Sequence, residues 1–209
     1  VVILRGEGRS LCSGAALKQP RSGTAANMLG SKQGARMYDT LLHLNAVTIC
    51  CCHGYMIGGG GVLPAACDFR IGSPTSSLTL NEVSIGFNLT WHSVPVLVNL
   101  VGPHKAKEML ILGRTYGLEH LDAMGFFTET VADDAELIPA AERLAAEVVR
   151  QPPVPVTVSK ASINAQAMPL GRAIQHLDHV TSGYMGKSES SRTARLTYFS
   201  DDPRVWSDD

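Results

Sequence analysis

The sequence has no long hydrophobic run and no excess of charge of one sign. No apolar stretch approaches the roughly 18–20 residues that a membrane-spanning helix requires. The 18 basic residues stand against 19 acidic ones, so there is no general electrostatic reason to bind nucleic acid or an anionic membrane. We therefore expect neither nucleic acid nor a membrane span. The 209 residues are enough for one globular domain with a sizeable core, with or without a helical appendage.

Cysteine is present but lacks the spacing of a disulfide framework or a metal site. Three of the five cysteines, Cys50 to Cys52, are adjacent. Neighbouring residues on a strand point to opposite faces, so these three cannot form a compact set of bridges. The CxxC spacing of zinc sites is absent as well. We interpret the cysteines as small buried side chains in a reducing compartment, such as the mitochondrial matrix, a peroxisome or the bacterial cytoplasm, and expect no metal.

Several familiar catalytic and nucleotide-binding motifs are also missing. The glycines at 54–60 do not fit the GxGxxG spacing of dinucleotide-binding proteins, and no Gly-Lys-Ser/Thr follows as a P-loop requires. No GxSxG nucleophile motif occurs. These absences argue against those three classes of protein.

The most informative segment that is present covers residues 53–82. Glycines occupy positions 58–61, between a strand-like segment at 47–52 and a small, apolar, helix-like segment at 62–67. Ordering such a run costs backbone entropy, and it is typical of places where N–H groups approach a ligand closely. A strand-to-helix junction also favours negative charge. The segment therefore predicts an anion-stabilising turn with one acid, Glu82, in reach.

Strand-like and helix-like segments alternate through the first two thirds of the chain. This alternation predicts an α/β core, and the all-helical last third predicts a helical subdomain. Residues 19–34 are polar, lack a period and are predicted to form a loop. The chain begins at Val1 inside a strand-like segment, without methionine, so we expect a fragment or a processed form. Strands are expected at 1–4, 47–52, 69–71, 77–80 and 126–131, and helices at 35–44, 91–101, 103–112, 118–124, 135–150, 154–167 and 170–180.

Several motifs in register resemble the enoyl-CoA hydratase/isomerase (crotonase) superfamily. They are SLCSGAALK, VTICCCHGYMIGGGGVLPAACDFRI, LNEVSIG, LVGPHKAKEMLILGR and AMGFFTETV. The resemblance implies an α/β crotonase-like fold in which ββα units stack into a spiral over residues 1–132. A helical C-terminal trimerisation region is implied for residues 133–209. The family's first strands would lie before Val1.

The resemblance also implies a coenzyme A thioester as the substrate, with coenzyme A as part of the substrate and no separate cofactor. The amides of Ala15 and Gly59 would form an oxyanion hole, and removing one such donor typically costs about 3–4 kcal/mol of barrier. Lys18 would pair with the nucleotide end. The other residues implied to bind substrate are Ala16, Leu17 and Gly58.

The carboxylates discriminate between reactions within the superfamily. Hydratases of this type use two glutamates, and the corresponding positions here are Val62 and Glu82. This pattern resembles the 3,2-trans-enoyl-CoA isomerase type, in which the single glutamate also follows Leu-Asn. Glu82 would then carry a proton from C2 of a 3-enoyl thioester to C4. Leu89 and Trp91 are expected to form the wall of the acyl pocket.

Two departures from the family pattern keep alternatives open. Ala16 replaces a customary aspartate, and Asp201 occupies a position that is basic in the family. One alternative is an enoyl-CoA hydratase or another crotonase-type acyl-CoA enzyme. The other is a degenerate, non-catalytic acyl-CoA-binding or assembly subunit. A homotrimer or hexamer is implied in each case.

Overall fold

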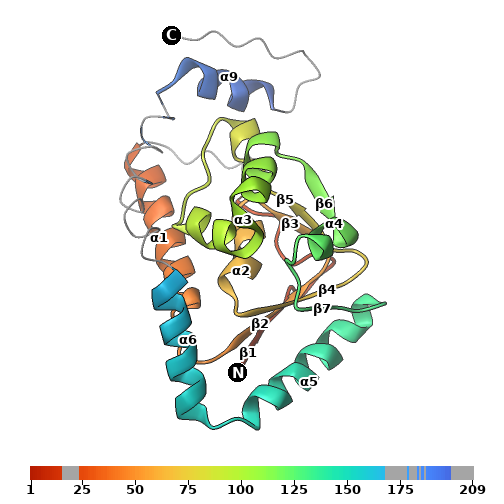
Figure 1. Ribbon diagram of the computed structural model, residues 1–209. Helices are drawn as coiled ribbons and strands as arrows, with labels where there is room; N and C mark the ends of the chain where they lie inside the picture. The colour runs from red at the N-terminus through yellow and green to blue at the C-terminus, as the bar shows by residue number, and fades with distance from the viewer. Residues whose placement is uncertain (16–23, 168–177, 179–182, 184, 186, 199–209) are drawn as a thin grey trace.

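The computed structural model describes residues 1–15, 24–167, 178, 183, 185 and 187–198, with the side chains of 24–31 left aside. Two sheets form its centre (Figure 1). The first is wholly parallel, in the order β1-β2-β4-β7, and the second has the order β3-β5-β6, with β6 antiparallel to β5. The strands are β1 (Val2–Leu4), β2 (Thr48–Cys52), β3 (Tyr55–Ile57), β4 (Phe69–Gly72), β5 (Ser77–Thr79), β6 (Thr115–Gly117) and β7 (Glu129–Thr130).

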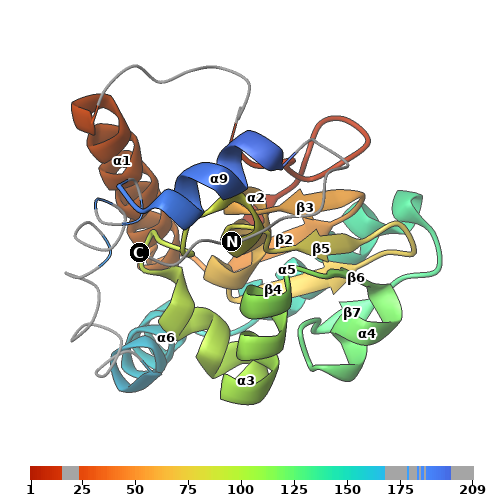
Figure 2. The same cartoon turned by 90° about the horizontal axis from the view of Figure 1, so that it is seen from above.

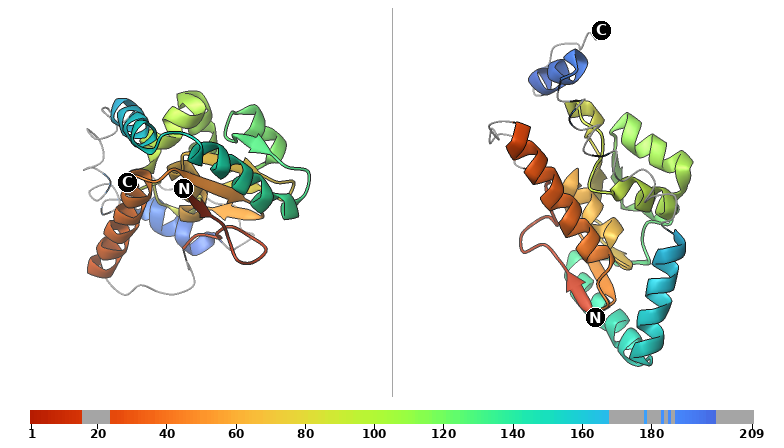
Figure 3. Two further views of the ribbon diagram at one scale, coloured as in Figure 1. Left: turned by 90° about the horizontal axis from the view of Figure 1, so that it is seen from below. Right: turned by 90° about the vertical axis from the view of Figure 1, so that its left-hand side faces the viewer.

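Helices cover both faces of the parallel sheet. Seen from below, α5 crosses the strands on one side (Figure 3, left), and α2 packs on the other side against β2, α1 and α3. The mixed sheet and α9 lie toward the top of the molecule, which Figure 2 shows from above. The helices are α1 (Thr24–Leu42), α2 (Gly59–Ala66), η1 (Val83–Ile85), α3 (Ser93–Leu112), α4 (Leu118–Ala123), η2 (Asp134–Glu136), α5 (Leu137–Val149), α6 (Pro153–Ala167) and α9 (Glu189–Thr197).

The adjacent cysteines of β2 divide between the two faces, as expected for a strand. Cys50 and Cys52 belong to the main core with α2 and α3, whereas Cys51 packs with α5 in a second cluster. All three are buried, and all five cysteines of the chain are free thiols. The prediction of small buried side chains is confirmed for these three and for Cys67, and it is wrong for Cys12, which is only partly buried.

Most predicted elements appear within a few residues of their expected bounds, and two points need correction. Helix α1 begins at Thr24, so the loop predicted for residues 19–34 is wrong from residue 24 onward. The two helices predicted at 91–101 and 103–112 are confirmed, because the two halves of α3 are separated at Gly102, whose φ of 77° and ψ of 160° are not helical. Strands β3 and β6 were not predicted, because three residues are too few to show a period. The predicted helix at 170–180 lies almost entirely outside the described residues.

Helix α6 contacts the C-terminal end of α1, where Asn164 Nδ2 donates to the Leu42 carbonyl at 3.0 Å, without burying a residue of its own (Figure 1). Lys160 Nζ donates to Asp68 Oδ2 at 2.6 Å and to the Ala46 carbonyl at 2.9 Å. Asp68 Oδ2 also accepts from the Thr48 amide at 2.8 Å. Polar contacts therefore fix α6 to the loops around β2. Within the described residues, no helix is long and apolar enough to span a membrane.

Candidate active site

The glycine turn places a free backbone donor at the start of a helix. Gly58 adopts a positive φ of 53° as the N-cap of α2, and its amide donates to the Thr79 carbonyl at 2.8 Å. The Gly61 amide donates back to the Gly58 carbonyl at 2.7 Å. Among the described residues the Gly59 amide has no such partner, as expected for the first residue of a helix. A donor of this kind favours an anionic oxygen.

The loop at residues 12–15 lies alongside this turn. The Ile57 amide donates to the Cys12 carbonyl at 3.1 Å, and the two segments form a parallel bridge between Cys12 and Met56. Gly14 has a φ of 85°, and a Cβ there would meet the Ile57 carbonyl oxygen at 2.5 Å and lie 3.9 Å from Gly59 N. Only glycine fits this approach. The approach places Gly14, the residue before Ala15, close to the Gly59 turn, and the role of the Ala15 amide as an oxyanion donor stays a prediction.

The remaining residues of that predicted substrate-binding loop, Ala16, Leu17 and Lys18, lie outside the described residues. Their roles stay predictions. Ala15 is the last described residue before them and is exposed.

Glu82 follows β5 and lies directly against the glycine turn. A Cβ on Gly58 would come within 2.9 Å of Glu82 Oε1. The second carboxylate oxygen, Oε2, is buried and has no hydrogen-bond partner among the described residues. Burial raises the pKa of Glu82 to about 7 from 4.5. Its carboxyl group can therefore accept and return a proton near neutral pH.

An apolar side chain occupies position 62, where the resemblance implies that a hydratase would carry a second glutamate. Val62 is only 2% exposed and belongs to the main core, on the first turns of α2. The valine side chain has no group that could hydrogen-bond a water molecule. Among the described residues, no group of three or more histidine, cysteine, aspartate or glutamate side chains is placed to hold a metal ion.

The two residues that were predicted to line the acyl pocket, Leu89 and Trp91, have different surroundings in the structure. Leu89 is buried in the main core. The Trp91 indole lies over the glycine turn, and a Cβ on Gly59 would meet its Cη2 at 2.5 Å. The opposite part of the ring lies against Gly34 of α1, where a Cβ would overlap Trp91 Cε2. Trp91 is thus in direct contact with one of the two predicted oxyanion donors.

Sequence reasoning missed the contribution of the C-terminal helix. Tyr198, directly after α9, accepts a hydrogen bond of 2.6 Å from Asn81 Nδ2, next to Glu82. Arg195 stacks over the Phe87 ring at 5.0 Å. These contacts dock α9 on the segment that carries Glu82. The sequence separation of more than a hundred residues hides this pairing, because Asn81 lies in the LNEVSIG motif whereas Tyr198 belongs to none of the motifs quoted above.

An α/β fold with a glycine turn, a backbone donor and one buried carboxyl group defines a class of proteins that stabilise an anion next to an acid/base. The comparisons with known proteins assign the family. The family model described as enoyl-CoA hydratase/isomerase matches residues 1–209, and the chain belongs to this family.

Curated relatives carry several names within the family. The mevalonyl-coenzyme A hydratase SIDH of Beauveria bassiana is 25% identical, over 99% of this chain and 78% of the relative. A probable enoyl-CoA hydratase of Bacillus subtilis is 31% identical, over 73% of this chain and 60% of the relative. The enoyl-CoA isomerase/hydratase fer4 of Mycosarcoma maydis is 28% identical, over 80% of this chain and 61% of the relative. The chain thus spans about three fifths of the length of two of these relatives and about four fifths of the other.

Solved structures show the same fold. An enoyl-CoA hydratase from Mycobacterium avium subsp. paratuberculosis matches with a TM-score of 0.84 at 19% identity, covering 99% of this chain and 80% of that chain. An enoyl-CoA hydratase/isomerase from Pseudoalteromonas atlantica matches with a TM-score of 0.83 at 18% identity, covering 98% and 80%. The predicted crotonase-like α/β fold is confirmed. The division at residue 132 and the absence of the family's first strands stay predictions.

Proposed function

We propose that this protein isomerises 3-enoyl-CoA to 2-trans-enoyl-CoA with Glu82 as the only acid/base. The observation that carries the proposal is the combination of a glutamate at position 82 with a valine at position 62. One buried carboxyl group lies against the glycine turn, and the position that would supply a second one is a buried valine. Moving a proton within one substrate needs one such group, whereas holding and splitting a water molecule is served by two.

In the proposed reaction, ionised Glu82 removes a proton from C2 of the thioester. The electron pair passes to the thioester oxygen, which becomes anionic, and the amides of Gly59 and Ala15 donate to it. The protonated carboxyl group then returns the same proton at C4, and the double bond moves to C2–C3. The raised pKa, about 7, suits a group that must act both as base and as acid.

Coenzyme A is proposed as part of the substrate, with no separate cofactor. Ala16, Leu17 and Lys18 would contact it, the lysine at its phosphates. We also propose a homotrimer or hexamer, since α6 exposes Val154, Val158 and Ile163 to solvent in one chain, at 70%, 57% and 66%.

The test is a side-by-side incubation with 3-enoyl-CoA and 2-enoyl-CoA, following double-bond migration and hydration separately. Migration that is much faster than hydration is the expected result. Val62→Glu is expected to introduce some hydration, because it restores a second carboxyl group near the substrate. Fast hydration by the parent protein would overturn the isomerase proposal.

Hydration of 2-enoyl-CoA is the second candidate function, because relatives named enoyl-CoA hydratase match as well as any other. The same incubation distinguishes the two reactions. Binding of a thioester without either reaction would favour the non-catalytic alternative.

A further inference from the structure

We propose that Trp91 closes the acyl end of the site, held in place by a His92–Asp39 pair, and so restricts the substrate to short acyl groups. This inference rests on the proposed acyl-CoA function and specifies its substrate class. It assigns Trp91 as the specificity-determining residue and Asp39 and His92 as positioning residues.

The indole fills the space between two glycines from distant parts of the chain. Its six-membered ring contacts Gly59 at the predicted oxyanion hole, and the fused edge of the ring contacts Gly34 of α1. A side chain larger than hydrogen at either glycine would collide with the ring. An acyl group whose carbonyl sits on the Gly59 amide, with C2 facing Glu82, therefore meets the indole within its first few carbons.

The backbone that carries the indole is strained. Trp91 and His92 both lie in the left-handed region, with φ values of 61° and 60°. Residues other than glycine rarely adopt this backbone conformation. Two consecutive residues keep it only when surrounding contacts hold them. These are the only two non-glycine residues with a positive φ in the described part of the chain.

Contacts from both sides of the turn hold this conformation. His92 Nδ1 is 2.9 Å from Asp39 Oδ2 of α1, and the His92 amide donates to Asp178 Oδ2 at 2.9 Å. The Ser93 hydroxyl donates to the Thr90 carbonyl at 2.6 Å. The His92–Asp39 contact ties the turn to the helix that carries Gly34, so it fixes the indole relative to its seat.

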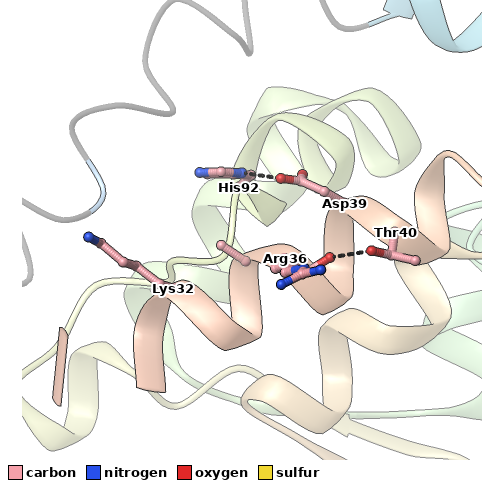
Figure 4. Close-up of a pocket in the computed structure, with 6 residues that line it drawn as sticks. Lys32, Arg36, Asp39, Thr40 and His92 are labelled. Carbon is pink, nitrogen blue, oxygen red and sulfur yellow. Dashed lines mark hydrogen bonds and ion pairs between the residues drawn. The ribbon is translucent and has the colours of Figure 1, made fainter. Parts of the chain in front are cut away.

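A wide surface depression of about 420 Å³, called a cavity below, adjoins the His92–Asp39 contact on the side of α1 (Figure 4). Ala35 and His92 line it, and they are the chain neighbours of Gly34 and Trp91. Its volume lies in the range of ligand pockets. Removing the indole would join the cavity to the space beside Gly59, and a longer acyl chain could then enter. The other lining residues are Lys32, Arg36, Asp39 and Thr40.

The first test compares the affinities of butyryl-CoA and decanoyl-CoA, two saturated thioesters that cannot react, by titration calorimetry. The parent protein is expected to bind butyryl-CoA at least about tenfold more tightly. Trp91→Ala is expected to remove or reverse this preference, and Trp91→Leu to give an intermediate ratio. Equal affinities in the parent, or a Trp91→Ala ratio equal to the parent's, would overturn the inference while leaving the proposed function in place. Failure of both thioesters to bind the parent would overturn both.

The second test concerns the positioning pair. Asp39→Ala is expected to move the ratio of the two affinities toward that of Trp91→Ala, because the turn loses its tie to α1. Asp39→Asn keeps an oxygen that can accept from the imidazole, and it is expected to retain most of the parent ratio. Asp122→Ala, at an exposed position of α4, is the matched control. A parent-like ratio in Asp39→Ala would show that His92 and Asp39 do not position Trp91.

Discussion

At the scale of the single residue, Glu82 combines two opposing properties, the need to ionise and burial of its carboxyl group. The carboxyl group must ionise to act as a base, yet its buried oxygen has no partner among the described residues to stabilise the charge. Burial raises its pKa to about 7. The result is a stronger base than an exposed glutamate, present in ionised form only toward neutral pH and above.

This pKa predicts the pH dependence of turnover. If ionised Glu82 is the base, kcat/KM for 3-enoyl-CoA is expected to rise through a midpoint at about pH 7 and to level off above it. Initial rates between about pH 5 and pH 9 would measure the curve. A rate that is already at its plateau at pH 5 would mean that an ordinary exposed carboxylate, or another group, acts as the base.

Glu82→Gln is expected to lower turnover by at least about 10²–10⁴-fold, because one group performs both proton transfers.

The same variant tests whether burial raises the pKa of Glu82. The folded pKa is raised above the unfolded value, so the folded parent binds more protons and loses stability as pH rises from 4.5 to about 7. Glutamine cannot ionise, so the variant is expected to gain in Tm relative to the parent across this window.

Thermal melts of both proteins at the two ends of the window would measure the difference. Glu119→Gln, at an exposed position of α4, is the control and is expected to show no such change. If the difference in Tm between Glu82→Gln and the parent is the same at all pH values, burial does not raise the pKa of Glu82.

Residues inside one motif were predictable, and residues that meet across the fold were not. The glycine run and the adjacent Leu-Asn-Glu carry their chemistry in the local sequence, so Gly59 and Glu82 were singled out and lie together in the structure. The contacts of Trp91 with Gly34 and of Asn81 with Tyr198 join segments that share no motif. Such pairs exist only once the helices have packed.

At the scale of the element, α1 shows why a local pattern can mislead. Residues 24–34 read as a loop because they contain two glycines and no apolar period, yet they form the first turns of a helix. Glycine lowers helix propensity. At Gly34 that loss accompanies a packing requirement, since the Trp91 ring lies where a side chain would be. The tertiary contact, which the sequence does not display, outweighs the propensity.

Helix α6 provides a prediction at the same scale. It buries no residue of its own, and the Lys160 side chain, 9% exposed, reaches the partly buried Asp68 carboxylate. Lys160→Met is expected to destabilise the protein by about 3 kcal/mol, because it leaves a partly buried carboxylate without its cation. Urea unfolding would measure this change.

Two comparisons make the α6 result specific. Lys105→Met removes a partly exposed ion pair with Glu108 on the surface of α3 and is expected to destabilise the protein much less than Lys160→Met. Asp68→Asn combined with Lys160→Met is expected to recover part of the loss, since the uncompensated charge is gone. Equal effects of Lys160→Met and Lys105→Met would show that α6 is not held by this pair.

At the scale of the whole molecule, the described chain leaves apolar side chains of α6 in water. Val154, Val158 and Ile163 are each more than half exposed, and α6 buries none of its residues in the chain's own core. Exposed apolar groups of this kind on one element are typical of surfaces that another protein covers. Their position in the predicted trimerisation region favours another copy of this chain as the cover.

Sedimentation of the parent protein is therefore expected to show trimers or hexamers, and Val158→Asp is expected to shift the distribution toward monomers. The physical reason is that a carboxylate placed in an apolar interface loses its hydration without gaining a partner. Ile111→Asp introduces the same charge at an exposed apolar position of α3 and is the matched control. A parent protein that sediments as a monomer at every concentration would contradict the prediction. An assembly that Val158→Asp and Ile111→Asp weaken equally would show that the contact does not run through α6.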